Sequence, residues 1–332
     1  MAAPDKAPWK LDPEFAKATS TLFAARSMAP KIPVSATHVR RQMLNATSKM
    51  LRYMRTIKLD ARVQKAVYEV VSSHDGASVK VFHYFRNDLH KGGPPTAALL
   101  HFHGGGFISG GVEILDEGIR LHVGATAVPW FSVEYRLAPE HKHPTQLRDC
   151  YDALEWLHAH TAEFNVDRRR IGVVGESNGS GLALAVAMLA RDRGLAPPLA
   201  KQILVYPMLD DRVLTPDPKI EPVASWTIED TLCSWAAVLN EAPGSENVPL
   251  HAAPGRAEPE DLKNLPPMYI EVGVIDSFRD SVIELVQKLL KAGVATDFHL
   301  VNGQVHAAEF LAPETAIAKS CLSMRQTAMT SF

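Results

Sequence analysis

Cysteine is scarce in this sequence: the chain of 332 residues contains three. Cys150, Cys233 and Cys321 lie far apart, and none has the Cys-x-x-Cys spacing of a zinc or redox site. An odd number of isolated cysteines argues against a disulfide framework and fits a reducing compartment. We therefore expect buried free thiols in a non-secreted, cytoplasmic protein.

Long apolar runs and concentrations of one charge are also missing. The sequence has no stretch of about 18 apolar residues, which a membrane-spanning helix would need, and its first residues lack the apolar core of a secretion signal. The net charge is −2 and no long basic run occurs, so nothing attracts the chain to nucleic acid or to an anionic membrane. We expect neither as a partner, whereas the sequence leaves a homodimer open.

Short apolar segments alternate with helical patterns through most of the chain. Two helical patterns in residues 1–62 come first, and strands are then expected at 63–71, 79–85, 97–102, 130–135, 171–174, 202–206, 268–272 and 296–301. Strands that alternate with helices in this way form a mostly parallel sheet covered by helices on both faces. The predicted fold class is therefore α/β.

Residues 210–262 interrupt this alternation. Their composition shifts to Pro, Asp and Glu, and a stretch of this length is too long for a structureless loop in a compact domain. We expect an insertion with short helices of its own, which forms a cap together with residues 1–62. The core then consists of residues 63–209 and 263–332. The second amino-terminal helix carries Met43, Met50 and Met54 on its apolar side, which favours packing over something apolar.

One glycine-flanked serine lies between an expected strand and an expected helix. In Gly175-Glu176-Ser177-Asn178-Gly179 the serine falls at a sharp strand-to-helix turn, which needs the close backbone approach that glycine permits. Such a turn exposes the hydroxyl at the carboxyl end of the sheet. The pattern alone is weak, because it should arise by chance in roughly one chain of this size in ten. Its value depends on partners elsewhere.

A glycine run follows the strand expected at 97–102. In His103-Gly104-Gly105-Gly106-Phe107, several backbone N–H groups are free of side chains, as the stabilisation of a developing oxyanion requires. A phosphate-binding loop is the rival interpretation. The chain has no Gly-Lys step and no Gly-x-Gly-x-x-Gly, which argues against it.

An acid and a base follow in the order that a strand-turn serine requires. Asp276 comes four residues after the strand expected at 268–272, and His306 comes five residues after the strand at 296–301. The carboxyl ends of parallel strands meet at one edge of a sheet, so both side chains should converge on Ser177.

The two glycine motifs, together with the segments 134–140 (EYRLAPE), 204–210 (LVYPMLD) and 276–280 (DSFRD), resemble the hormone-sensitive-lipase-like branch of the α/β-hydrolases, which includes the bacterial family IV esterases. The resemblance implies an α/β-hydrolase fold with an eight-stranded sheet and a helical cap, and carboxylester hydrolysis without a cofactor or metal. By position, Gly105, Gly106 and Asn178 would supply the oxyanion-hole amides.

The chain departs from the family pattern at two places. It has Glu176-Ser177-Asn178-Gly179-Ser180 where Asp-Ser-Ala-Gly-Gly is usual, and His306-Ala307-Ala308 where His-Gly-Phe is usual. Neither change removes a catalytic atom. The Asn178 side chain adds a polar group beside the nucleophile.

The chemistry implied is that of a serine carboxylesterase. Ser177 attacks the ester carbonyl, His306 accepts its proton and Asp276 fixes the imidazole tautomer. We expect a small ester of short or medium acyl length, bound against Phe107, Met28 and Trp226.

Two alternatives keep the fold. An acyltransferase or a lactone-forming or lactone-hydrolysing enzyme would use the same triad, and a non-catalytic ligand receptor would lack the triad histidine, whereas His306 is present. A metal hydrolase is suggested by three His-x-His pairs (101/103, 141/143 and 158/160), but no carboxylate motif accompanies them.

Overall fold

The computed structural model describes residues 9–28, 31–53, 58–88 and 93–332. Eight strands within these residues form one sheet in the order β1-β2-β4-β3-β5-β6-β7-β8. β1, β2 and β4 pair antiparallel, and all other neighbours pair parallel. The strands are β1 (Val63–Val71), β2 (Ser78–Arg86), β3 (Thr96–Phe102), β4 (Trp130–Glu134), β5 (Val166–Glu176), β6 (Lys201–Val205), β7 (Met268–Ile275) and β8 (Thr296–Val305). This arrangement confirms the α/β class and the mostly parallel sheet.

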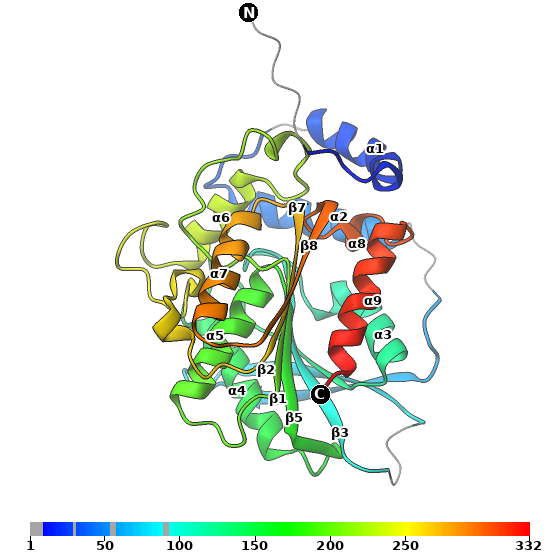
Figure 1. Cartoon of the computed structure of the whole chain (residues 1–332), viewed down its shortest axis with the longest axis vertical. Helices are drawn as coiled ribbons and strands as arrows, with labels where there is room; N and C mark the ends of the chain where they lie inside the picture. The colour runs from blue at the N-terminus through cyan, green and yellow to red at the C-terminus, as the bar shows by residue number, and fades with distance from the viewer. Residues whose placement is uncertain (1–8, 29–30, 54–57, 89–92) are drawn as a thin grey trace, which may run out of the picture.

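Helices cover both faces of the sheet (Figure 1). One face carries α4 (Thr145–Ala159), α5 (Asn178–Asp192) and α7 (Arg279–Lys291), and the other carries α3 (Val112–Thr126) and α9 (Ala316–Thr330). Each face has its own apolar cluster, which includes Leu154 and Leu184 on the first and Ile119 and Met329 on the second. α5 is buried almost all round, as its uniformly apolar sequence predicts. The three cysteines are buried and unpaired.

A further set of helices lies at the end of the sheet where the parallel strands finish (Figure 1). The amino-terminal helices α1 (Pro13–Met28) and α2 (Thr37–Tyr53) lie there, together with η1 (Glu221–Val223) and α6 (Ile228–Val238) from residues 210–262. From the same segment, η2 (Pro254–Arg256) and η3 (Pro259–Leu262) instead pack beside α5 and α7. The short helix α8 (Ala308–Leu311) follows β8. The amino-terminal helices, η1 and α6 cover the carboxyl ends of the strands, where the predicted site residues meet.

The expected apolar contact of α2 forms through Leu44, which packs against the larger apolar cluster, but the prediction is wrong for the described methionines of the helix. Met43 and Met50 are 43% and 49% exposed, and Met54 lies outside the described residues. Arg40 is the buried residue of α2, and its guanidinium pairs with Asp230 of α6. A buried ion pair therefore joins the helix to the insertion, and Met43 and Met50 face solvent.

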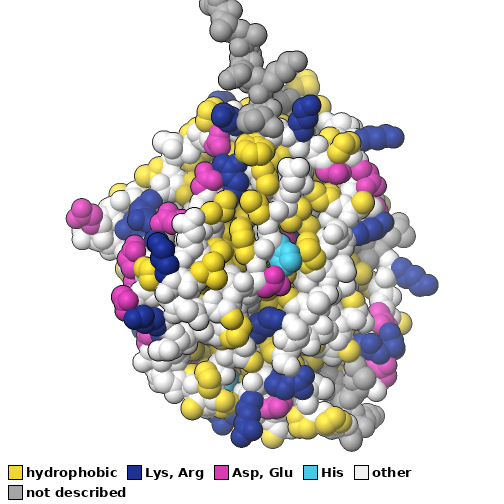
Figure 2. Space-filling model, viewed as in Figure 1, with side chains coloured by type: hydrophobic (Ala, Val, Ile, Leu, Met, Phe, Trp, Pro, Cys, Tyr) yellow, Lys and Arg dark blue, Asp and Glu magenta, His cyan; other side chains and the backbone are white. Residues whose placement is uncertain are grey.

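The face seen in Figure 2 shows basic and acidic side chains mixed around its margin, while apolar side chains gather toward its middle. Leu290 of α7 and Leu300 of the edge strand β8 are 59% and 45% exposed. None of the helices in the described ranges is both long and apolar enough to cross a membrane.

Candidate active site

Ser177 occupies the single residue between β5 and α5, with a strained backbone of φ 56° and ψ −122°. Both flanking glycines are required by the packing of this turn. A Cβ on Gly175 would lie 2.2 Å from the carbonyl oxygen of Gly179, and a Cβ on Gly179 would lie 2.0 Å from that of Phe102. The turn places the serine hydroxyl at the carboxyl edge of the sheet.

The structure brings Ser177, His306 and Asp276 into one hydrogen-bonded chain. His306 Nε2 is 3.0 Å from Ser177 Oγ, and His306 Nδ1 is 2.8 Å from Asp276 Oδ2. The other carboxylate oxygen accepts from the Phe278 backbone N–H over 2.9 Å. All three side chains are buried. This is the geometry that an activated serine needs, because the carboxylate holds Nδ1–H and leaves Nε2 free to accept the hydroxyl proton.

Asp280 lies away from this chain. Its side chain is 77% exposed and pairs with Arg279, in the first turn of α7. It therefore does not reach His306.

Aromatic rings enclose the imidazole of His306. The rings of Tyr206, Phe278 and Trp226 lie 4.6, 5.2 and 6.1 Å from it, centroid to centroid. The Ser225 hydroxyl also donates to the His306 carbonyl. Packing on several sides holds the ring in the orientation that both hydrogen bonds require.

Tyr206 is in turn anchored by a buried charged group that the sequence analysis missed. Its hydroxyl donates to Glu309 over 2.7 Å, and Arg325 of α9 pairs with Glu309 and with Glu271 of β7. Burial raises the pKa of Tyr206 well above its usual value, so the phenol stays neutral. A lone arginine in a helical pattern carries no signal of such a role.

The glycine loop lies beside the nucleophile. Gly105, Gly106 and Phe107 all have positive φ angles, of 124°, 62° and 62°. A Cβ on Gly106 would lie 2.8 Å from the Trp226 ring. Trp226, which is 8% exposed, therefore stands next to both the loop and His306, while Phe107 is buried against Trp235 at 5.6 Å between ring centroids.

The Asn178 side chain bonds to this loop. The Gly106 N–H donates to Asn178 Oδ1 over 2.8 Å, and Asn178 Nδ2 donates to the Tyr135 hydroxyl over 3.0 Å. The expectation that Gly106 offers a free amide is therefore wrong for this structure, because the neighbouring side chain takes that hydrogen bond. The N–H groups of Gly105 and Asn178 make no hydrogen bond to any described residue.

Glu176 has a separate, structural partner. Its Oε2 is 2.8 Å from His101 Nε2, and His101 Nδ1 is 2.9 Å from the Ser132 hydroxyl. Burial alone would raise the pKa of Glu176, but the adjacent His101 lowers it overall. Glu176 therefore links the end of β5 to β3 and β4 through His101 and Ser132, next to Ser177.

Met28 does not line the site. Its side chain is 85% exposed at the end of α1. That helix instead packs against an apolar cluster through Phe15 and Phe23. The prediction of Met28 as a pocket residue is therefore wrong. Among the described residues, no group of three or more His, Cys, Asp or Glu side chains is arranged to hold a metal ion.

Comparisons with known proteins agree with this geometry. A family model described as the alpha/beta hydrolase fold matches residues 99–310. Esterase LipI of Mycobacterium tuberculosis is 38% identical over 224 residues, which cover 64% of this chain and 68% of that protein. Carboxylesterase NlhH of the same species is 34% identical over 212 residues, which cover 63% of this chain and 65% of that protein. These alignments span about two thirds of the relatives' length.

Among solved structures, a bacterial heroin esterase superposes with a TM-score of 0.83 and 31% sequence identity, over 97% of each chain. The family model covers well over half of the chain, and this structural match covers nearly all of it. The chain therefore belongs to the α/β-hydrolase fold family, within its hormone-sensitive-lipase-like group of esterases.

Proposed function

We propose that this carboxylic ester hydrolase acts on dissolved esters of short or medium acyl length and forms an acyl-enzyme on Ser177. The observation that carries the proposal is the buried chain of hydrogen bonds from Ser177 Oγ through His306 to Asp276. The relatives named as esterases and carboxylesterases support the same reaction class.

In this mechanism His306 Nε2 accepts the Ser177 proton as the oxygen attacks the ester carbonyl. The free N–H groups of Gly105 and Asn178 donate to the oxyanion, and Asp276 stabilises the imidazolium that forms. His306 then protonates the leaving alcohol. Water, activated by the same histidine, releases the acid.

The limit on acyl length follows from the aromatic walls. Phe107 and Trp226 are both buried beside the glycine loop. Each additional buried CH₂ contributes about 0.8 kcal/mol of binding until the acyl chain meets a wall, after which overpacking costs more. The rate should therefore peak at short or medium acyl chains.

The test is the measurement of kcat/KM for p-nitrophenyl esters from acetyl to palmitoyl, below and above their solubility limits, with Ser177→Ala as the control. We expect a maximum at short or medium length and no activity in the control. A steady rise to palmitoyl with a jump at the solubility limit would identify a lipase instead.

The intact hydrogen-bonded triad favours catalysis over a non-catalytic receptor. The same assay with added alcohols separates hydrolysis from acyl transfer, because an acyltransferase would form the new ester faster than the free acid. A cytoplasmic location and the lack of a nucleic-acid partner stay predictions from composition, and the sequence leaves a homodimer open.

A further inference from the structure

The segment after β6 holds the nucleophile through backbone hydrogen bonds. The Ser177 N–H donates to the Val205 carbonyl over 2.9 Å, and the Met208 N–H donates to the Ser177 carbonyl over 3.0 Å. Tyr206 lies between Val205 and Met208 and has a φ of 37°, in the left-handed region that a tyrosine rarely adopts. Its N–H donates to the Glu271 carbonyl of β7 over 2.7 Å. The backbones of Tyr206 and Ser177 therefore have fixed positions relative to each other.

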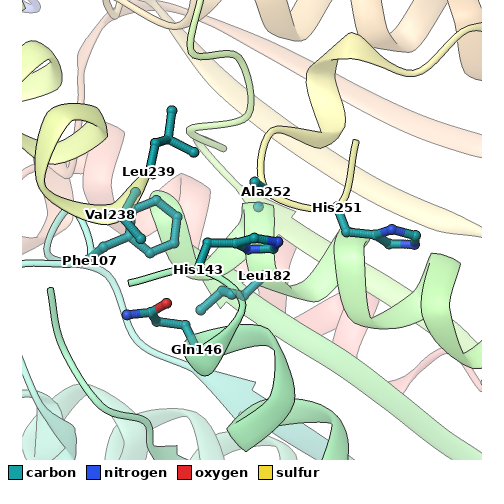
Figure 3. A pocket seen from close by; sticks show the side chains of 9 residues that line it. Phe107, His143, Gln146, Leu182, Val238, Leu239, His251 and Ala252 are labelled. Carbon is teal, nitrogen blue, oxygen red and sulfur yellow. The ribbon is translucent and has the colours of Figure 1, made fainter. Parts of the chain in front are cut away.

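The first turns of α5 have little room to shift toward the insertion. The cavity between Leu182 of α5, Phe107 and Gln146 (Figure 3) has a volume of about 10 Å³, which is room for about one water molecule. Close packing of this kind resists displacement. The separation of the nucleophile from its base therefore depends on where the His306 loop is held.

Tyr206 reaches that loop with its side chain. Its ring lies 4.6 Å from the imidazole of His306, centroid to centroid, with an interplanar angle of 62°. Its hydroxyl donates to Glu309 Oε1 over 2.7 Å. Glu309 lies in α8, and Ala307, between His306 and this helix, has a φ of 54°. Because one tight turn joins His306 to Glu309, the hydroxyl bond holds the loop while the ring packs against the base.

Arg325 keeps Glu309 ionised. Arg325 is 2% exposed, and its guanidinium donates to Glu309 Oε1 over 2.6 Å and to Glu271 Oε1 over 2.5 Å. Burial alone would raise the pKa of Glu309, but the charge of Arg325 lowers it overall. A hydrogen bond to an ionised carboxylate is about twice as strong as one between neutral groups. The Tyr206 hydroxyl therefore has a strong acceptor in a fixed position.

The strands that carry the nucleophile and the base are not neighbours. Ser177 follows β5 and His306 follows β8, and β6 and β7 lie between these strands in the sheet. Tyr206 follows β6 and contacts the loop after β8, so its side chain spans this gap. Proton transfer takes place between Ser177 Oγ and His306 Nε2, which are 3.0 Å apart. A displacement of about 1 Å between reacting groups can cost about 10²-fold in rate.

We propose that Tyr206 and Glu309 are positioning residues, whose hydrogen bond sets the distance between Ser177 Oγ and His306 Nε2. The proposal rests on the proposed esterase function. Loss of this bond lets the His306 loop move away from the serine turn. The rate of each proton transfer then falls, while the binding of the ester stays the same.

Tyr269→Phe is the matched control for Tyr206→Phe. The Tyr269 hydroxyl donates to Glu271 Oε2 over 2.5 Å, and Arg325 pairs with this carboxylate too. Both tyrosines are buried, so each change removes one buried hydroxyl from the same group of charges. The bond of Tyr269, however, joins two residues of β7, and its ring lies 5.0 Å from that of His299. It does not connect the serine turn to the loop of the base.

Steady-state hydrolysis of p-nitrophenyl butanoate gives kcat and KM, with the active sites counted by organophosphonate titration. We expect Tyr206→Phe to lower kcat about tenfold and to change KM by less than about twofold, because His306 acts in both acylation and deacylation. Tyr269→Phe should keep kcat within about twofold of the wild type.

Variants of Glu309 test the same bond from its other end, and they serve if Tyr206→Phe does not fold. Glu309→Ala should lower kcat as far as Tyr206→Phe does, and the double variant should lose no more, because both changes break one bond. Glu309→Gln keeps an oxygen that accepts from the hydroxyl, so it should recover most of kcat.

The NMR signals of the His306 imidazole nitrogens test the positioning without turnover. They are assigned by their loss in His306→Gln. They should shift in Tyr206→Phe and stay unchanged in Tyr269→Phe. If the wild-type enzyme hydrolyses no ester, the proposed function fails, and this comparison still decides whether Tyr206 positions His306.

A Tyr206→Phe enzyme with kcat within about twofold of the wild type would overturn the proposal. Equal losses of kcat in the two tyrosine variants would also overturn it, because any damage to the buried charges would then suffice. A rise in KM at unchanged kcat would place Tyr206 in substrate binding instead, which contradicts a positioning role.

Discussion

The backbone N–H of Gly106 donates to the side-chain Oδ1 of Asn178 over 2.8 Å, so the residue after the nucleophile is tied to the glycine loop. Asn178 is fully buried, and its Nδ2 donates onward to Tyr135, whose hydroxyl bonds to the His103 carbonyl. One amide that an oxyanion would otherwise use is thereby occupied in the resting enzyme.

Asn178→Ala should raise kcat and lower stability. The Gly106 N–H then lacks a partner in the free enzyme and gains one only when the oxyanion forms, which favours the transition state. We expect kcat to rise by about tenfold, since one oxyanion donor is worth at most 10²–10³. The free energy of unfolding should fall by about 1–3 kcal/mol. Steady-state kinetics and urea unfolding measure the two effects.

Tyr135→Phe is the control for that variant. It removes the acceptor of Asn178 Nδ2 but leaves the bond between Asn178 and Gly106. It should therefore lower stability without raising kcat. A fall of kcat in Asn178→Ala would mean that the side chain serves to hold the loop in its catalytic shape.

Asp276→Asn should cost on the order of 10⁴ in kcat, because an amide can favour the wrong tautomer of His306. Asp276 Oδ2 lies 2.8 Å from His306 Nδ1. Asp280→Asn should change kcat little, because that side chain is 77% exposed. If Asp280→Asn proves the inactive variant, the carboxylate assignment is wrong.

Arg40→Ala should destabilise the protein by up to about 3 kcal/mol, because it leaves the buried Asp230 carboxylate with only the partly exposed Arg26 as a cationic partner. Both Arg40 and Asp230 are buried, and their ion pair joins α2 to α6. Arg26 also reaches Asp230, at 3.2 Å. Asp230→Ala should cost a similar amount, and the double variant should cost less than the sum. Additive losses in urea unfolding would show that the pair is not coupled.

Stability should fall as the pH drops from about 7 toward 4, in part through His122. Burial lowers the pKa of His122 to about 4, against about 6.5 when unfolded. Between these values the unfolded chain binds more protons, so protonation favours unfolding as the pH falls. His122→Gln cannot titrate, and between pH 7 and 5 it should lose about 2 kcal/mol less than the wild type. If the wild type and His122→Gln lose the same free energy of unfolding over this pH range in urea unfolding, a group other than His122 causes the pH dependence.

The fold was readable from the sequence because its signals are local. The β-branched run 171–174 and the uniformly apolar helix after Ser177 each carry their own periodicity, and glycines mark the turns where backbones approach. The chain order of Ser177, Asp276 and His306 could be anticipated for the same reason, since each follows a strand that ends at the same edge.

The contacts that the sequence could not supply depend on tertiary placement. The rotamer of Asn178 follows from where Gly106 and Tyr135 lie in space, and no spacing encodes that. The same holds for Met28 and Met43, whose apolar character suggested burial, whereas their helices dock through other residues. Arg40 was missed because an arginine in an amphipathic helix is usually solvated.

Covalent labelling of Ser177 tests the central claim most directly. The purified, folded protein is treated with a serine-directed organophosphonate, and intact mass and peptide mapping locate the adduct. The account predicts one adduct per chain, on the peptide that contains Ser177, together with loss of esterase activity and no adduct in Ser177→Ala. An adduct on another residue, or none in folded protein that still hydrolyses esters, would contradict it.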